Sequence, residues 1–515
     1  MRNPTGLVIL ILGLWWVAGC GGNKPISQPP SQTSSVTSVT VSCVPASVQV
    51  AQTSQCTATI AGTGSYSSAV NWSAVSGAIS SAGLYTASPT VPASGSDTVK
   101  ATSTQDASKT GQVLITVTLP GTAGTCGGMS LGNNASLNGF VPFPPTYAWN
   151  TNIANAPLDP NNTAITTASG FVGNYLHPDF SSVAGGNYGI PYEVVDSSTQ
   201  PLVSVNVVAY PGESDVAHAP FPANAPIEGN PGNCVGGPGN YVGDQHVLIL
   251  DRNRCILYET FNTKYCGGAW SADSETIWDM QSDEMRPWGW TSGDAAGLSI
   301  FAGLVRYDEV ASGAIHHAIR FTLPHTKNDA NGGYWVEPAT HAAGTEWGVW
   351  PVMGMRIRLK ASFNISTFSA TNQVILRAMQ QYGMILADNG SYFFFQGTPD
   401  PRWNDNDLSN LKSVPSSAFE VVQTTPTYPG WDTATAPTGT APVINSFTAT
   451  PSTVTAGTPV TLSWTTTNDS YDYIDLLGGV HGGNITITPA ATTTYHLTAT
   501  NQYGPTTQAV TVTVH

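Results

Sequence analysis

The chain carries little charge, and cations are the scarcer sign. Only 10% of its 515 residues are charged, and 17 Lys and Arg stand against 32 Asp and Glu, which gives a net charge of −15. Nucleic acids select proteins with clustered Lys and Arg, and anionic lipid surfaces attract the same side chains. The composition therefore argues against nucleic acid as a partner and against charge-driven binding to lipid.

Several signatures of catalysis and metal binding are also missing. The sequence has no G-x-S-x-G elbow, phosphate-binding loop, H-E-x-x-H motif or dinucleotide fingerprint. No C-x-x-C spacing supports a thiolate metal site. We therefore expect neither a metal nor a cofactor. Asp388-Asn389-Gly390 resembles a fragment of a calcium loop, but one such tripeptide is more often a turn.

The one early apolar run is short. Residues 7–16 follow the single cation Arg2 and lead into Val17-Ala18-Gly19-Cys20. Such a run is too brief to span a membrane and is typical of a secretory signal. Cysteine directly after Ala-Gly resembles a bacterial lipoprotein signal, which implies that residues 1–20 are the signal with an acylated Cys20. An ordinary signal peptide cleaved near Gly22 is the alternative.

The lipoprotein resemblance implies an exported protein held at the outer membrane or cell surface, with membrane contact through the lipid alone. Apart from Cys20, six cysteines remain, and an even number in an exported chain predicts three disulfides. Cys43 and Cys56 lie in consecutive strand-like runs and are expected to pair. We favour Cys255 with Cys266 across a hairpin, which leaves Cys126 with Cys234.

Gly (52 residues) and Pro (37 residues) punctuate short runs of alternating apolar and polar residues, which predicts an all-β fold with few helices. Residues 21–37 lack apolar periodicity and are expected to be a disordered tether. Residues 38–119, with Val70-Asn71-Trp72-Ser73 and Gly83-Leu84-Tyr85, resemble a bacterial immunoglobulin-like domain. Residues 441–515, with Trp464, resemble a second such domain or a carbohydrate-accessory module. The resemblance implies sandwiches with Trp72 and Trp464 in their cores.

The segment between them, residues 121–423, is followed by a linker at 424–440. Its strand-like runs, and helical patterns only at 372–381 and 406–411, predict a large jelly-roll or sandwich-like β domain. The runs at 288–292, 303–309 and 383–390 are similar to a group of uncharacterised secreted bacterial proteins, which implies no activity. All cations from Arg252 to Lys412 lie in this domain, so we expect the functional site there.

Carboxylates and a histidine suggest acid–base chemistry in the central domain. Asp244 and His246 lead into a predicted strand and would share one of its faces. There they could orient a general base or ligate a metal, or simply form a surface pair. Glu259 and Asp279 lie on neighbouring predicted strands. If Asp244, Glu259 and Asp279 are acid–base residues, they must converge in one cleft.

Candidate substrate-binding residues come from the same domain. Arg320, near His316, could clamp a carboxylate such as that of a uronic acid, or could pair with Asp308 or Glu309. Indole rings stack on sugars, and tryptophans beside glycine in apparent loops are difficult to bury. The tryptophans of this kind are Trp288, Trp290, Trp347 and Trp350.

These features together predict a surface-anchored carbohydrate-active enzyme, a glycoside hydrolase or polysaccharide lyase acting on an extracellular polysaccharide. The alternative is a non-catalytic glycan-binding or adhesive surface lipoprotein, with the same aromatic residues and idle carboxylates.

Overall fold

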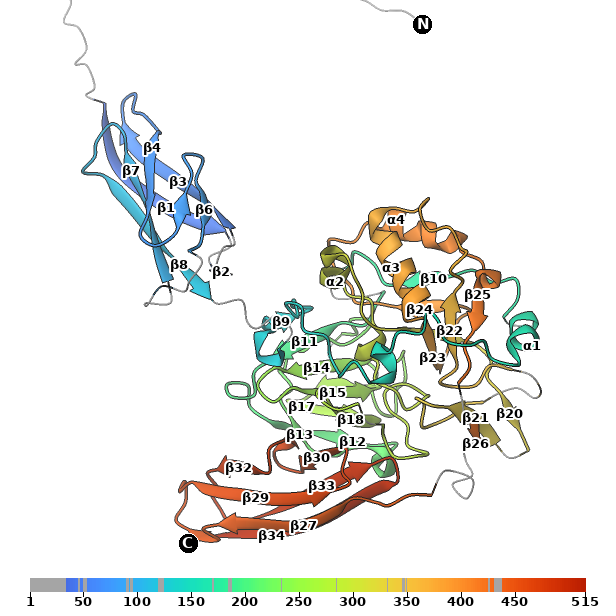
Figure 1. The fold of residues 1–515 in the computed structure, drawn as a ribbon. Coiled ribbons are helices and arrows are strands. Elements are labelled where there is room, and N and C mark those ends of the chain that lie inside the picture. The colour runs from blue at the N-terminus through green and yellow to red at the C-terminus, as the bar shows by residue number, and fades with distance from the viewer. Residues whose placement is uncertain are drawn as a thin grey trace, which may run out of the picture. The chain divides into compact units, whose positions relative to one another are not determined.

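The computed structural model describes residues 34–44, 47–49, 53–88, 92, 96–118, 125–168, 171–183, 188–232, 234–283, 285–330, 332–344, 348, 350–424, 427–429 and 438–515. Cys20, residues 21–33 of the predicted tether, Trp347 and most of the predicted linker lie outside them. The last residues of the predicted tether belong to a strand, because β1 (Ser35–Val44) begins at Ser35. The chain divides into two compact units, residues 1–120 and 121–515 (Figure 1).

Strands dominate the described residues, and the predicted predominantly β fold is confirmed. Four α-helices occur among the described residues. They are α1 (Asn162–Thr167), α2 (Tyr307–Ser312), α3 (Ala370–Gln381) and α4 (Asp405–Leu408). The two predicted helical segments correspond to α3 and α4. No helix in this part of the chain is both long and apolar enough to cross a membrane.

The N-terminal unit consists of two four-stranded sheets. They are β1 (Ser35–Val44), β3 (Thr53–Thr63), β6 (Leu84–Thr86) and β5 (Ala78–Ile79) in one, and β2 (Ser47–Gln49), β8 (Thr110–Thr118), β7 (Ser96–Ser103) and β4 (Val70–Ala74) in the other. Their core holds fully buried Tyr85, Val99 and Ile115, and Trp72 packs against it half-buried. Alternating burial along β3 and β7 explains why the sequence reads so clearly as strands.

The central part of the second unit is built from four sheets. The five-stranded sheet consists of β18 (Ser274–Asp279), β15 (Ile256–Phe261), β14 (Val247–Asp251), β11 (Tyr192–Val195) and β9 (Gly132–Asn133). The six-stranded sheet consists of β10 (His177–Asp179), β24 (Phe394–Gln396), β19 (Ile319–Leu323), β23 (Met384–Asn389), β22 (Arg356–Leu359) and β25 (Phe419–Val421). A four-stranded sheet consists of β13 (His218–Ala219), β12 (Val203–Val207), β17 (Ala269–Ala272) and β16 (Lys264–Cys266), and a three-stranded sheet of β20 (Asn328–Asp329), β21 (Gly332–Val336) and β26 (Thr427–Pro429).

Two further sheets form the C-terminal part, which we call the C-terminal module (residues 438–515). They are β27 (Val443–Thr450), β29 (Val460–Thr467) and β32 (Asn484–Ile487), and β28 (Thr453–Val454), β34 (Gly504–Val514), β33 (Thr493–Asn501), β30 (Tyr471–Ile474) and β31 (Gly478–Val480). Trp464 is buried in the core between them, as predicted.

The five-stranded sheet containing β14 and β15 is buried on both faces. Leu248 and Leu250 point into the main core, which also includes the six-stranded sheet and α3. Val247 and Ile249 point into a second core, which includes Trp270 of β17 and the tyrosines of β30. The C-terminal module therefore completes a core of the central part, and Figure 1 shows its strands beside β12 and β13.

All six described cysteines form disulfides, but two of the three predicted pairings are wrong. Cys43 pairs with Cys56 as predicted, whereas Cys126 pairs with Cys255 and Cys234 with Cys266. The expected hairpin does not exist, because β16 pairs with β17 and not with β15. The full length of β15, about 20 Å, separates Cys255 from the start of β16. Three disulfides indicate an oxidising, extracytoplasmic compartment.

Candidate active site

An open pocket of about 430 Å³ is lined by loop residues and by the ends of strands β15 and β23, and we call it the acidic pocket. The carboxylates that line it are Glu213, Asp244, Asp294 and Asp388. The rings that line it are Tyr210, Tyr241, Phe261 and His341. Tyr241 is 61% exposed and Tyr210 43% exposed, so two large rings face solvent at a concave site. Among the described lining residues, none is Lys or Arg.

A buried ion pair supports one wall of the acidic pocket. Arg320 on β19 is 3% exposed, and its Nε donates to Asp294 Oδ2 at 3.1 Å, while Nη2 donates to the other carboxylate oxygen. Neither alternative partner holds Arg320, because Glu309 pairs with Arg306 at 2.6 Å and Asp308 accepts hydrogen bonds from Ser136 and Leu137. Burial raises the pKa of Asp294, although Arg320 opposes that rise. Arg320 is thus occupied within the protein and does not line the pocket.

Asp388 is brought to the pocket by strand β23. The four residues before it, 384–387, are buried, and Asp388 emerges half-buried at the rim. Its Oδ1 accepts a hydrogen bond from Asn389 N at 2.6 Å, and Oδ2 accepts one from Ala295 N at 3.4 Å. Burial, together with the nearby Asp294 and Asp244, raises the pKa of Asp388 to about 7, against the effect of Arg320. Asp388 therefore exchanges its proton near neutral pH.

Asp244 and His246 do not share a strand face, contrary to the prediction. Gln245 adopts a φ of 47°, and β14 begins only at Val247, so the alternation of a strand does not extend to them. Asp244 is exposed in the pocket and accepts a hydrogen bond from the Tyr241 hydroxyl, whereas His246 is 2% exposed. The two side chains therefore have different environments.

His246 is a buried cation that supports the pocket from behind. Its Nδ1 lies 2.6 Å from Glu228 Oε2, and its Nε2 lies 3.1 Å from the Gly293 carbonyl oxygen. Both ring nitrogens face acceptors, so both must donate. Burial opposes the charge, but the Glu228 carboxylate outweighs it and raises the pKa of His246 to about 9. His246 thus fixes the loop that carries Asp294.

Glu259 and Asp279 lie outside the acidic pocket, so the predicted convergence with Asp244 does not occur. Glu259 is fully buried, and its carboxylate accepts hydrogen bonds from Trp278, Ser299, Ile300 and Phe301. Asp279 is at the other end of β18, 3.4 Å from His481 of the C-terminal module. β15 pairs with β18 over its whole length, which keeps Asp279 far from the pocket end of the sheet.

The predicted substrate-binding residues are scattered in the structure. His316 is exposed beside Tyr382. The Trp288 ring lies 6.4 Å from that of Trp335, and the Trp350 ring 5.6 Å from that of His325. None of these residues lines the acidic pocket in the described part of the chain. Trp347 lies outside the described residues.

No protein-family model matches this chain, and no curated protein is significantly similar to it. Among the described residues, no three His, Cys, Asp or Glu side chains are grouped as metal ligands. The site is therefore interpreted from its own residues.

Sequence reasoning missed Asp294, His341 and Glu213, and treated Asp388 only as part of a turn. One signal was available for Asp388, since a carboxylate that follows four apolar strand residues stands at the exposed end of a buried strand. Asp294 belongs to the run of small and polar residues Thr291-Ser292-Gly293-Asp294, a pattern that indicates a loop and gives no sign of a functional carboxylate.

Stability should fall as the pH rises from 6 to 9. In the folded protein, burial raises the pKa of the carboxyl groups of Glu259, Asp388 and Asp472 to about 7. Burial alone would lower the pKa of His246, but the Glu228 carboxylate outweighs it and raises that pKa to about 9. A group whose pKa is raised on folding stabilises the folded state when the pH is below its pKa in the unfolded chain. That stabilisation is lost as the pH rises through its pKa in the folded protein. We expect the Tm measured by calorimetry to fall by at least about 2 °C.

The Asp388→Asn variant serves as the control, because it removes one of the titrating groups and should show a smaller decrease in Tm. A Tm that is constant or rises between pH 6 and 9 would contradict the assignment.

Proposed function

We propose that the chain is an extracytoplasmic carbohydrate-active enzyme, a glycoside hydrolase that cleaves a polysaccharide in the acidic pocket. The observation that carries the proposal is the presence of Asp388 and Asp244 in one solvent-accessible pocket with exposed tyrosine rings. Glycosidases use two carboxyl groups in different environments, one to protonate the leaving oxygen and one as base or nucleophile. The full architecture that we propose has immunoglobulin-like sandwiches at both ends and a lipid on Cys20.

Asp388 is the proposed general acid. With a pKa of about 7, a substantial fraction of Asp388 is protonated at neutral pH and can deliver the proton to the glycosidic oxygen. Asp244 is exposed to solvent and is the proposed base or nucleophile. Tyr210 and Tyr241 are available to stack on sugar rings at the pocket.

A hydrolase is favoured over a polysaccharide lyase. A lyase must neutralise the carboxylate of a uronic acid, a task to which cationic side chains are well suited. The described lining has four carboxylates and neither Lys nor Arg, and Arg320 is already paired with Asp294. A neutral or amine-bearing sugar therefore fits the pocket better than a uronic acid.

The test is a screen of the full-length protein on neutral, amino-sugar and uronic-acid polysaccharides. New reducing ends without unsaturated products, on a neutral or amino-sugar polymer, are expected. Binding without any product on all polymers would overturn the proposal in favour of a glycan-binding protein, and unsaturated products would show a lyase.

A further inference from the structure

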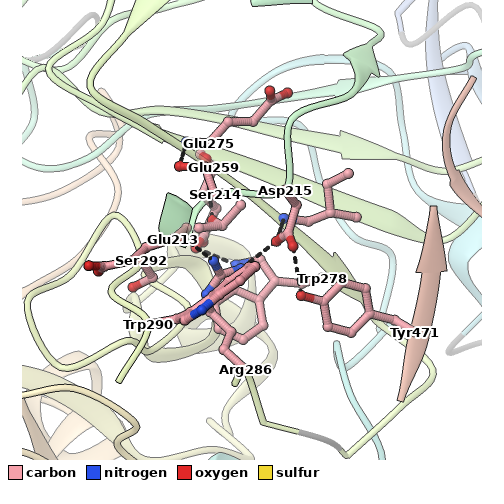
Figure 2. A network of polar contacts seen from close by, with 12 residues as sticks. Glu213, Ser214, Asp215, Glu259, Glu275, Trp278, Arg286, Trp290, Ser292 and Tyr471 are labelled. Carbon is pink, nitrogen blue, oxygen red and sulfur yellow. Dashed lines mark hydrogen bonds and ion pairs between the residues drawn. The ribbon is translucent and has the colours of Figure 1, made fainter. Parts of the chain in front are cut away.

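A buried polar network joins the C-terminal module to the central part (Figure 2). The Tyr471 hydroxyl on β30 donates to Asp215 Oδ1 at 2.9 Å. The other oxygen of Asp215 accepts from Ile277 N at 3.0 Å and forms an ion pair with Arg286. Asp215 and Arg286 have no exposed surface, and Tyr471 is 8% exposed. The hydroxyl of a module residue therefore helps to fix a fully buried ion pair.

Arg286 extends this network to the wall of the acidic pocket. Its Nε donates to the Thr291 carbonyl oxygen at 2.9 Å, and its Nη2 donates to the Glu213 carbonyl oxygen at 2.7 Å. Glu213 Oε2 in turn accepts from Thr291 N at 3.1 Å. Both Glu213 and Thr291 line the pocket. A planar guanidinium holds its donors in a fixed geometry, so the position of Arg286 sets the positions of both residues.

The indole rings of Trp278 and Trp290 hold Arg286 in place. Their centroids lie 5.7 Å and 5.4 Å from its guanidinium carbon, and Figure 2 shows the guanidinium beside both rings. These contacts, with the ion pair, leave the guanidinium little room to shift unless Asp215 moves with it.

A second connection reaches the same segment from a different part of the module. Trp288 N donates to the carbonyl oxygen of Gln502, in the β33–β34 turn, at 2.9 Å. Gly289 N donates to the Thr340 carbonyl oxygen at 2.8 Å, and the Thr340 hydroxyl donates to the Trp290 carbonyl oxygen at 3.0 Å. The next residue, His341, lines the acidic pocket. The segment from Arg286 to Thr291 is thus held by the module at two points.

We propose that the C-terminal module is a working part of the acidic pocket and that Tyr471 is a positioning residue, which fixes Glu213 and Thr291 through Asp215 and Arg286. For turnover, this inference rests on the proposed function. The coupling between the module and the pocket wall rests only on the contacts described above.

The test compares Tyr471→Phe with Tyr473→Phe in the full-length protein. Both changes remove one hydroxyl from β30, but the Tyr473 hydroxyl bonds to Thr498 inside the module. By hydrogen-exchange mass spectrometry, Tyr471→Phe should speed exchange about fivefold in residues 211–215 and 286–294. Tyr473→Phe should leave these segments unchanged.

Kinetics on the polysaccharide found in the screen give a second readout. Tyr471→Phe should raise KM several-fold with kcat within about twofold, because Asp388 is untouched. A purely structural role would lower the folded fraction and hence the apparent kcat, with KM unchanged.

Unchanged exchange at 211–215 and 286–294, or equal changes in both variants, would overturn the positioning role even if the screen shows turnover. Faster exchange at these segments in Tyr471→Phe alone, with no product on any polymer, would support the coupling and reject the proposed hydrolase. The two failures are therefore distinguishable.

Discussion

Replacement of Arg286 by methionine should lower the free energy of unfolding by about 3–5 kcal/mol, the cost of breaking a buried ion pair by removing one partner. Asp215 would keep its contacts with Tyr471 and Ile277 but would become a buried carboxylate without a cation. The Thr291 and Glu213 carbonyl oxygens would also lose their donor. Urea unfolding followed by tryptophan fluorescence measures the effect.

Two variants control for the loss of an arginine as such. Arg402 pairs with Asp400, but its side chain is 56% exposed, so Arg402→Met should cost no more than about 1 kcal/mol. The double variant Arg286→Met/Asp215→Leu should recover part of the loss, because no buried charge remains. A loss below about 1 kcal/mol in Arg286→Met would show that the network is not a buried ion pair of the kind described.

The second large effect concerns turnover. Asp388→Asn should lower kcat by about 10²–10⁴-fold on the polysaccharide that the screen identifies, because an amide cannot protonate the leaving oxygen. For the unmodified protein, kcat should fall as the pH rises through about 7, since burial holds the pKa of Asp388 near that value and the acid must be protonated to act. Steady-state kinetics at a series of pH values measures both.

Asp472→Asn is the matched control for this variant. Burial also raises the pKa of Asp472 to about 7, but Asp472 bonds to Trp464 inside the C-terminal module. It should keep kcat within about twofold. The role of Asp388 would be rejected if Asp388→Asn kept more than a tenth of the activity, or if both variants lost the same fraction.

The strands could be read from the sequence because alternation is a local property. The predicted strands after His246 and around Glu259 and Asp279 are β14, β15 and β18, and α3 lies where its pattern placed it. The disulfides could not be read in the same way, because a pairing depends on which strands are neighbours. Cys126 and Cys255 are 129 residues apart, and nothing local to either indicates the other.

The candidate site was partly predictable. Asp244 was found because a carboxylate stands just before an apolar strand, but one residue with positive φ, Gln245, was enough to separate it from His246. From the sequence alone, Glu259 could not be distinguished from a catalytic acid. Nothing in its flanking residues shows that its carboxylate accepts hydrogen bonds from Phe301 and Ser299. Carboxylate roles depend on such distant partners, which periodicity does not report.

The placement of Tyr471 and Tyr473 in a core made otherwise by residues 195–277 has a consequence for biosynthesis. Contacts between segments so far apart in the chain form slowly, because the conformational entropy of the long loop between them is lost before the contacts contribute any stabilisation. Until β30 is synthesised and packs, its tyrosines do not cover the face of the five-stranded sheet that carries Ile249, Tyr258 and Ile277. The newly made chain therefore passes through a stage in which aggregation competes with folding, and holding chaperones would act on this surface.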